Sequence, residues 1–217
     1  MYPRITIFLL FALWLFGCTT TPSPRTCAEI LAPDLRALLT QPLSTKETRA
    51  KIASLYELPL DEVGVSSGGF GWRKGGIAGN LITEHPFGLK SPPAISIEFK
   101  ERPPTTQQVL DCLGAPDTYL YWYHAPPGTG YRPILDLELY FDQQGIRARV
   151  AQLGERNQPP RLDGTNPVVD LYYVQPDSRA KTMEELTLLI PSERKAKIKP
   201  WPGSWQDIVI DIDPSAR

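Results

Sequence analysis

The chain of 217 residues is poor in the side chains that most often carry out chemistry, since it has three cysteines and two histidines. His85 and His124 lie near prolines, and they are too far apart to share one turn of a helix. A catalytic zinc site generally needs three protein ligands. Cys112 has no histidine close to it in the sequence to act as the base that activates a cysteine nucleophile. We therefore expect no metal, no cofactor and no enzymatic activity.

An excess of charge is also absent. The chain has 23 Lys and Arg residues and 24 Asp and Glu residues, which gives a formal net charge of −1. A nucleic-acid-binding domain needs a basic face, so this balance argues against a nucleic-acid partner.

Residues 5–16 form an apolar run interrupted by Thr6 alone. A helix of that length would be about 18 Å long and too short to span a hydrocarbon core of about 30 Å.

Residues 1–17 have the layout of an export signal, with Arg4 ahead of the apolar run. The run ends in Leu15-Phe16-Gly17-Cys18, which resembles the lipobox of bacterial lipoproteins. In a lipobox, a leucine and a small residue precede an invariant cysteine that receives lipid. The resemblance implies lipidation of Cys18 by a diacylglyceryl group and usually a further acyl chain. An uncleaved signal anchor and a freely secreted protein are the alternatives.

Residues 18–26 contain two prolines and almost no apolar side chains, so we expect a flexible tether between membrane and folded domain. Two or three acyl chains anchor a protein stably, whereas one chain holds it only marginally. Thr19 differs from the aspartate that keeps lipoproteins in an inner membrane. The expected localisation is therefore the cell envelope, and the outer membrane if the source has two membranes.

Lipidation of Cys18 would leave two cysteines, Cys27 and Cys112, in an oxidising compartment. Disulfides form and persist in such compartments. A disulfide between these two residues is one outcome, and a pair of buried free thiols is the other.

Three helix starts are indicated by capping boxes, in which a Ser or Thr oxygen accepts from the N3 amide while a Glu or Gln at N3 reaches back. The first helix must break near Pro33, because proline lacks an N–H group and its ring clashes with the preceding turn. The second helix must end before Pro59. The capping pairs are Thr26 with Glu29, Ser44 with Glu47, and Thr105 with Gln108.

Residues 94–100 and 135–141 alternate between apolar and polar, as a half-buried antiparallel strand requires. A turn at 142–145 and a further alternating segment at 146–150 complete a predicted hairpin. Its register would place Glu138 opposite Arg149 on the solvent side. The core-side pairs would be Phe141 with Ile146, Leu139 with Ala148, and Leu137 with Val150. Weaker strands are expected at 79–84, 118–123, 168–174 and 208–212.

These patterns indicate an α+β fold with short helices packed on an antiparallel sheet. The helix from Ser44 leads to the alternating residues 95–99, and the helix from Thr105 leads to 137–141. We therefore predict two tandem modules, each a helix followed by sheet. The expected units are a signal peptide (1–17), a tether (18–26), a first α+β module (27–103), a second module (104–153) and a loop-rich C-terminal extension with strands (154–217).

Residues 105–116 and the later Phe141-Asp142-Gln143-Gln144-Gly145 resemble the SmpA/OmlA (BamE-like) family of small outer-membrane lipoproteins. The fold of that family is similar to each half of the β-lactamase-inhibitor protein. In those families a Val-x-x-x-Leu-Gly-x-Pro helix end packs on an antiparallel sheet that carries a Phe-Asp-x-x-Gly hairpin. The resemblance implies an α+β fold and a role in outer-membrane assembly or envelope integrity. The matching positions are Val109, Leu113, Gly114, Pro116, Phe141, Asp142 and Gly145.

An aromatic run, Tyr121-Trp122-Tyr123 with Tyr131 after it, is the candidate partner-binding site. Alternation along a strand puts Trp122 on one face and Tyr121 and Tyr123 on the other, so both faces cannot be ordinary solvated surface. Tyr and Trp are enriched at binding hot spots. Cross-strand packing inside the protein is the alternative interpretation.

A basic cluster lies near the C-terminus, and it consists of Arg194, Lys195, Lys197 and Lys199. Such a cluster can contact anionic lipid headgroups, and a solvated loop is the alternative. Taken with the anchor, the sequence predicts a lipid-anchored cell-envelope protein that acts as a non-catalytic protein-binding module. An inhibitor of an extracellular enzyme and a small envelope enzyme are the competing hypotheses.

Overall fold

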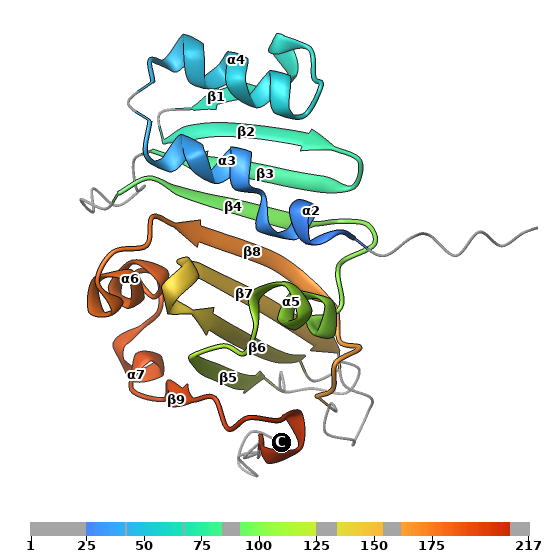
Figure 1. Ribbon diagram of the computed structural model, residues 1–217, viewed down its shortest axis with the longest axis vertical. Coiled ribbons are helices and arrows are strands. Elements are labelled where there is room, and N and C mark those ends of the chain that lie inside the picture. The colour runs from blue at the N-terminus through green and yellow to red at the C-terminus, as the bar shows by residue number, and fades with distance from the viewer. Residues whose placement is uncertain are drawn as a thin grey trace, which may run out of the picture.

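One antiparallel β-sheet organises the molecule, and short helices lie along one of its faces (Figure 1). A computed structural model describes residues 25–41, 43–66, 68–83, 92–124, 134–153 and 162–208. In this part of the chain, nine strands pair in the order β1-β2-β3-β4-β8-β7-β6-β5-β9. The predicted α+β class, with short helices on an antiparallel sheet, is confirmed.

The predicted signal peptide (1–17), Cys18 and the tether as far as residue 24 lie outside the described residues. So does the predicted strand 208–212, apart from Ile208, which is buried and follows a short 3-10 turn. Within the described ranges, no helix is both long and apolar enough to cross a membrane.

The first half of the fold is a group of short helices followed by a four-stranded meander. Its helical elements are α2 (Cys27–Leu31), α3 (Pro33–Arg36), η1 (Ala37–Leu39), α4 (Thr45–Leu55) and η2 (Leu60–Glu62). Its strands are β1 (Gly64–Ser66), β2 (Gly69–Lys74), β3 (Ile77–Ile82) and β4 (Ala94–Phe99).

The second half has the same order of elements, with one helix ahead of its own meander. It comprises α5 (Thr106–Leu113), β5 (Thr118–His124), β6 (Ile134–Phe141), η3 (Asp142–Gln144), β7 (Ile146–Leu153) and β8 (Val168–Val174). A last segment adds α6 (Arg179–Leu186), α7 (Ser192–Lys195), β9 (Lys199–Pro200) and η4 (Trp205–Asp207).

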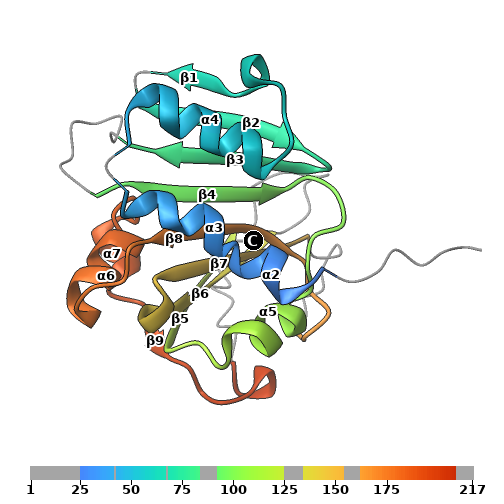
Figure 2. The same ribbon diagram turned by 45° about the horizontal axis from the view of Figure 1, so that its top comes forward.

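The two halves join at the centre of the sheet, where β4 and β8 run side by side (Figure 2). The repeat proposed from the sequence aligns residues 95–99 of β4 with residues 137–141 of β6. That alignment is wrong in its topology, because β4 and β8 are the strands that end each meander. β8 comes from the segment 154–217, expected to be an extension, yet it occupies the middle of the sheet. Whether the halves are tandem modules stays a prediction.

The three expected capping boxes all form. The side-chain oxygens of Thr26, Ser44 and Thr105 each accept a hydrogen bond from the N3 amide, and the side-chain oxygen of the N3 residue accepts one from the backbone N–H of the cap. The first helix ends at Ala32, which has a left-handed conformation (φ 43°), and a new helix begins with Pro33 at its first position. Proline is tolerated there because its missing N–H group would have no helical partner.

The predicted hairpin register of β6 and β7 is found, with Phe141 opposite Ile146 and Glu138 opposite Arg149. The expected solvent exposure of Glu138 is wrong. Its side chain is buried, with 4% relative exposure, accepts a hydrogen bond from the Tyr140 hydroxyl and lies 3.9 Å from Arg147. Glu138 is covered because Arg147 lies against it, and Arg147 in turn donates to the carbonyl oxygen of Leu186 at the end of α6.

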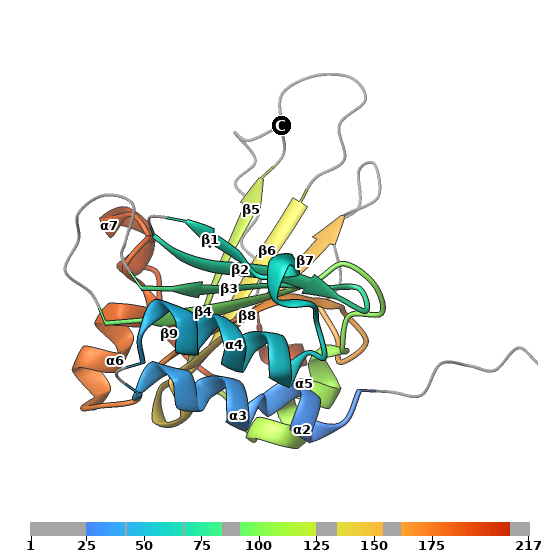
Figure 3. The same cartoon turned by 90° about the horizontal axis from the view of Figure 1, so that it is seen from above.

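Each face of the sheet carries one apolar cluster, and the two clusters differ in size. Helices α2 to α5 lie on one face, and the larger cluster fills the space between them and the strands (Figures 1 and 3). The smaller cluster is on the other face, where α6 and the residues after it cover one end of the strands. Its buried members are Ala94, Leu120, Tyr140, Tyr172, Val174, Leu186 and Ile190.

Cys27 and Cys112 form a disulfide, with an Sγ–Sγ distance of 2.05 Å. The bond joins the first turn of α2 to the last turn of α5, so it connects a helix of each half. The residues it links are 85 positions apart.

We expect the double variant Cys27→Ser/Cys112→Ser to lose about 4–5 kcal/mol of unfolding free energy, because the cross-link removes loop-closure entropy from the unfolded chain. Urea denaturation followed by circular dichroism measures the difference. Adding reductant should lower the midpoint of the wild type to that of the variant and leave the variant unchanged. A variant that unfolds at the wild-type midpoint would refute the stabilising role of the bond.

Candidate binding surfaces

The face of the sheet opposite helices α2 to α5, here called the open face, carries the polar side chains of the meander β1–β4. Cross-strand pairing sets them in rows. Arg73 lies opposite Ala78 on the next strand, and Ala78 lies opposite Glu98. The neighbouring row begins with Gly64 opposite Gly71 on the two outermost strands. The open face of this half is therefore polar along its rim and has almost no side chains on its floor.

These rows enclose a hollow of about 520 Å³. Gly64 and Gly71 leave bare backbone at its floor, and Ala78 adds only a methyl group. A volume of a few hundred Å³ is the usual size of a ligand pocket, and it is also large enough to receive a side chain or turn from another protein. The lining residues are Glu62, Gly64, Gly71, Trp72, Arg73, Ala78, Gly79, Asn80, Glu98 and Lys100.

The charges around the hollow are only partly neutralised. Lys100 and Glu98 form an ion pair at its rim. Within the described residues, neither Arg73 nor Glu62 has an oppositely charged side chain within 4 Å, and both are exposed. Asn80 adds an exposed carboxamide that can donate and accept hydrogen bonds. The hollow can thus pair with a partner that presents both a carboxylate and a cation.

The open face of the second half is different, because its charges satisfy one another. Arg149 donates to Asp136 and to Asp170, each at 3.1 Å. Arg147 lies over the ring of Tyr172 at 4.9 Å and 3.9 Å from Glu138. Buried charged groups, such as the acids of this network, are tolerated only when they are paired and hydrogen-bonded. This network is part of the fold and leaves few groups for a ligand.

Asp170 is one of the two acids that form an ion pair with Arg149, and its side chain is largely buried. Its pKa is raised from the ordinary value of 3.8, first by burial, and the charges of Glu138 and Glu98 act in the same direction. Arg147 and Arg149 lower the pKa, but their effect is smaller. Glu98 faces Asp170 directly across the β4–β8 junction, which explains this repulsion.

The aromatic run predicted to bind a partner lies on β5, and its members point to different faces. Tyr121 is half-buried on the helix-covered side, where its ring stacks on Tyr119 and the Nζ atom of Lys199 lies 5.6 Å from the ring centre. Trp122 is half-buried on the open face, under the guanidinium of Arg194 at 4.8 Å. Tyr123 follows on the same strand, opposite Leu135. Tyr131 lies outside the described residues.

Both rings are contacted by the chain's own C-terminal segment 191–208, here called the strap. The strap crosses the β5 edge of the sheet through β9, which pairs with Thr118 and Tyr119. Beyond β9, Trp201 packs edge-on against Tyr119 at 6.1 Å, and Trp205 packs against Trp201 at 4.8 Å. Part of the aromatic run therefore supports the strap, as the packing alternative anticipated, while its role in partner binding stays a prediction.

The residues around the hollow were not among those predicted from the sequence. A signal was present, since residues 68–76 are rich in glycine, and in the structure β2 and β3 form a hairpin there. Among the described residues, no group of three or more His, Cys, Asp or Glu side chains is arranged to hold a metal ion. Cys112 is in the disulfide and cannot act as a thiolate.

Comparison with protein-family models, curated proteins and solved structures finds no match to the chain. The likeness to the SmpA/OmlA family remains a prediction that rests on the residues quoted for it.

We expect Asp170→Asn to change how stability depends on pH. A folded-state pKa above the unfolded value means that the native state favours the protonated acid, so Asp170 stabilises less as pH rises through its raised pKa. The difference in unfolding free energy should therefore move in favour of the Asn variant as pH rises from about 3, below the ordinary pKa of 3.8, into the range of the raised pKa. Urea titrations across this range measure it, with exposed Asp61→Asn as control. A movement in favour of the wild type would show that the ion pair with Arg149 outweighs burial.

Proposed function

We propose that the chain is a non-catalytic protein-binding module of the bacterial cell envelope, attached to the membrane by lipids on Cys18, with a role in outer-membrane assembly or envelope integrity. The observation that carries the binding role is the open face of the first half. Helices cover one face of the sheet. On the other face, the part formed by β1–β4 is hollow and polar, and some of its charged side chains have no ion-pair partner among the described residues.

A protein partner suits this surface better than a small apolar ligand. The hollow has no exposed aromatic or aliphatic side chain at its rim, where Glu62, Arg73, Asn80, Glu98 and Lys100 provide charges of both signs. Complementary charges across an interface increase the rate of association and suppress wrong partners more than they increase affinity. The glycine floor would let a protruding turn of the partner approach the backbone of β1 and β2 closely.

The point where the chain enters the folded domain is held firmly, which suits a tethered protein. The guanidinium of Arg25 donates to the carbonyl oxygens of Arg102 and Glu101, and it lies 4.9 Å from the ring centre of Phe99. A tether that starts from a fixed point limits how far the domain can move from the membrane. It would therefore raise the effective concentration of the open face toward partners in the same membrane.

The anchor predicts that Cys18 is the sole site of acylation. Cells fed with labelled palmitate should incorporate label into the wild-type chain and lose it in Cys18→Ser, because the thioether requires the cysteine sulfur. Cys27→Ser should retain full labelling and serves as the matched control. Label that persists in Cys18→Ser, or a wild-type chain without label, would remove the anchor from the proposal.

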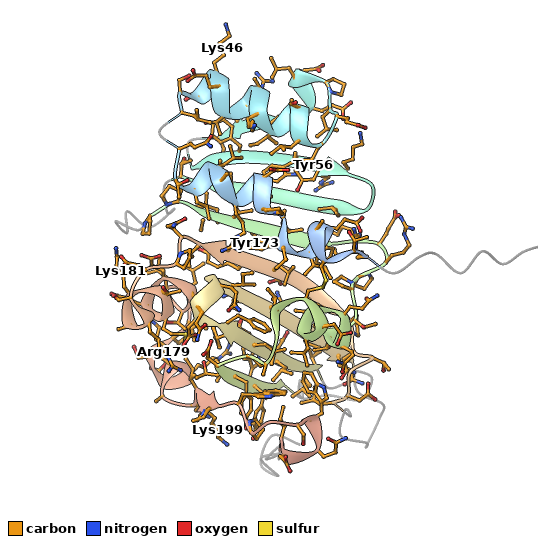
Figure 4. The ribbon with its side chains drawn as sticks, in the orientation of Figure 1. Lys46, Tyr56, Tyr173, Arg179, Lys181 and Lys199 are labelled. Atoms are coloured by element: carbon orange, nitrogen blue, oxygen red, sulfur yellow. A yellow bond between two sulfur atoms is a disulfide. The ribbon has the colours of Figure 1, made fainter. Side chains whose placement is uncertain are left out.

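The open face predicts a position-specific partner contact. A photo-crosslinking amino acid at Asn80, inside the hollow, should give a discrete protein adduct in intact cells. The same amino acid at Lys46, which is exposed on α4 on the covered side of the molecule (Figure 4), should give none. Adducts of equal yield at both positions, or none at Asn80, would contradict binding through the open face. Arg73→Glu should lower the yield at Asn80 by removing the cation.

A further inference from the structure

The strap carries four cations within six residues and no acid between them: Arg194, Lys195, Lys197 and Lys199. Among the described residues, no carboxylate lies within 4 Å of any of these four. Most cations near the sheet differ from these four, because each has a carboxylate within that distance, and Arg73 beside the hollow is an exception. The paired cations are Lys74, Lys100, Arg147, Arg149, Arg179 and Lys181. The four strap cations are thus a concentrated positive surface whose counter-charge is not supplied by neighbours in the described part of the chain.

Two of the four cations are held in place by aromatic rings. Arg194 lies over Trp122 on the open face, and Lys199 lies by Tyr121 on the other face of the same strand. A cation over an aromatic ring is attracted by the ring's negative face. Between them, Ile198 packs against the smaller apolar cluster. The two ends of the basic cluster are therefore held in place before any partner arrives.

An ordered surface loses less side-chain freedom on binding than a mobile loop does. This also gives the aromatic run a second use, because Tyr121 and Trp122 fix the positions of the groups that would meet the partner. Arg194 provides a planar fork that suits carboxylates, and the three lysines add charge around it.

We propose that the strap binds an acidic segment of a partner protein, at a surface separate from the hollow. The choice of a protein over a bilayer rests on the proposed anchor. The described chain starts at the side of the molecule where α2 begins, whereas α7 and β9 lie at the opposite side (Figures 1 and 3). With lipid on Cys18, the anchor joins the domain on the side opposite the strap, which leaves the strap open to proteins. An Asp- and Glu-rich segment then supplies the missing counter-charge.

The test uses the full chain in neutral detergent and a fluorescent oligoglutamate peptide, with oligoglutamine as the uncharged probe. Anisotropy should show binding of oligoglutamate alone, and binding should weaken as salt is raised because exposed charges are screened. Lys195→Glu/Lys197→Glu should reduce the affinity about tenfold. Lys46→Glu/Lys51→Glu makes the same change of net charge on α4, at the far end of the molecule from Lys199 (Figure 4), and should change it less than twofold.

A further variant tests the aromatic support without altering charge. Trp122→Leu should reduce oligoglutamate affinity because Arg194 loses its ring, and Trp122→Phe should restore most of it. The thermal midpoint of each variant, measured alongside, separates misfolding from loss of the contact. Equal losses in the strap variant and the α4 variant would overturn the proposal.

Two other results would also overturn it: no binding of oligoglutamate, or binding of phosphatidylglycerol vesicles by the strap in preference to the peptide. None of these outcomes alters the Asn80 crosslink or the Cys18 labelling. Failure of the strap and failure of the proposed function are therefore distinguishable.

Discussion

The pairing of β4 with β8 is the interaction on which the rest of the structure depends. Five antiparallel residue pairs, from Ala94 with Val174 to Glu98 with Asp170, merge two meanders into one sheet. Ile95 and Ile97 on β4 then continue the same apolar layer as Leu171 and Tyr173 on β8, so one core runs under helices from both halves. The Tyr173 hydroxyl donates to the carbonyl oxygen of Ile30 at 2.6 Å, which fixes α2 above the junction. Without this pairing, each half would expose a long unpaired strand to solvent.

The terminal strand at each edge of the sheet, β1 or β9, is a poor template for adding a further strand. β1 has three residues, and the carbonyl oxygen of Val63 next to it already accepts a hydrogen bond from Arg49 at 2.9 Å. At the other edge, β9 has two residues, one of which is Pro200 and has no N–H group to donate. Short strands and proline are the usual means by which proteins protect sheet edges. This is why both binding proposals concern side chains on faces and around an edge, and not backbone pairing.

Local rules were sufficient to predict the capping boxes and the β6–β7 hairpin, because each depends on residues within about ten positions of one another. They failed where distant segments decide the outcome. Alternation marks Glu138 as outward-facing, but whether that face is wet depends on α6, some forty residues later in the chain. The hollow needs the register of four strands, β1 to β4, which no single segment encodes, so its residues were not foreseen. The aromatic run and the basic cluster were each visible in the sequence, but as separate features. Only the fold brings Trp122 together with Arg194.

The spacing of charged residues differs between the two halves. This difference explains why the open face of the second half carries a network of ion pairs and that of the first half is hollow. In the second half, Arg149 lies directly beside Asp170 on the adjacent strand, so a cation and an acid meet across one strand spacing of about 4.8 Å. In the first half, Ala78 separates Arg73 from Glu98, so the two charges stand two strand spacings apart, about 10 Å. Gly64 and Gly71 extend the gap toward β1. The hollow follows from three small residues that keep complementary charges from reaching one another, and a partner that fills it would supply the contacts that the sheet itself cannot make.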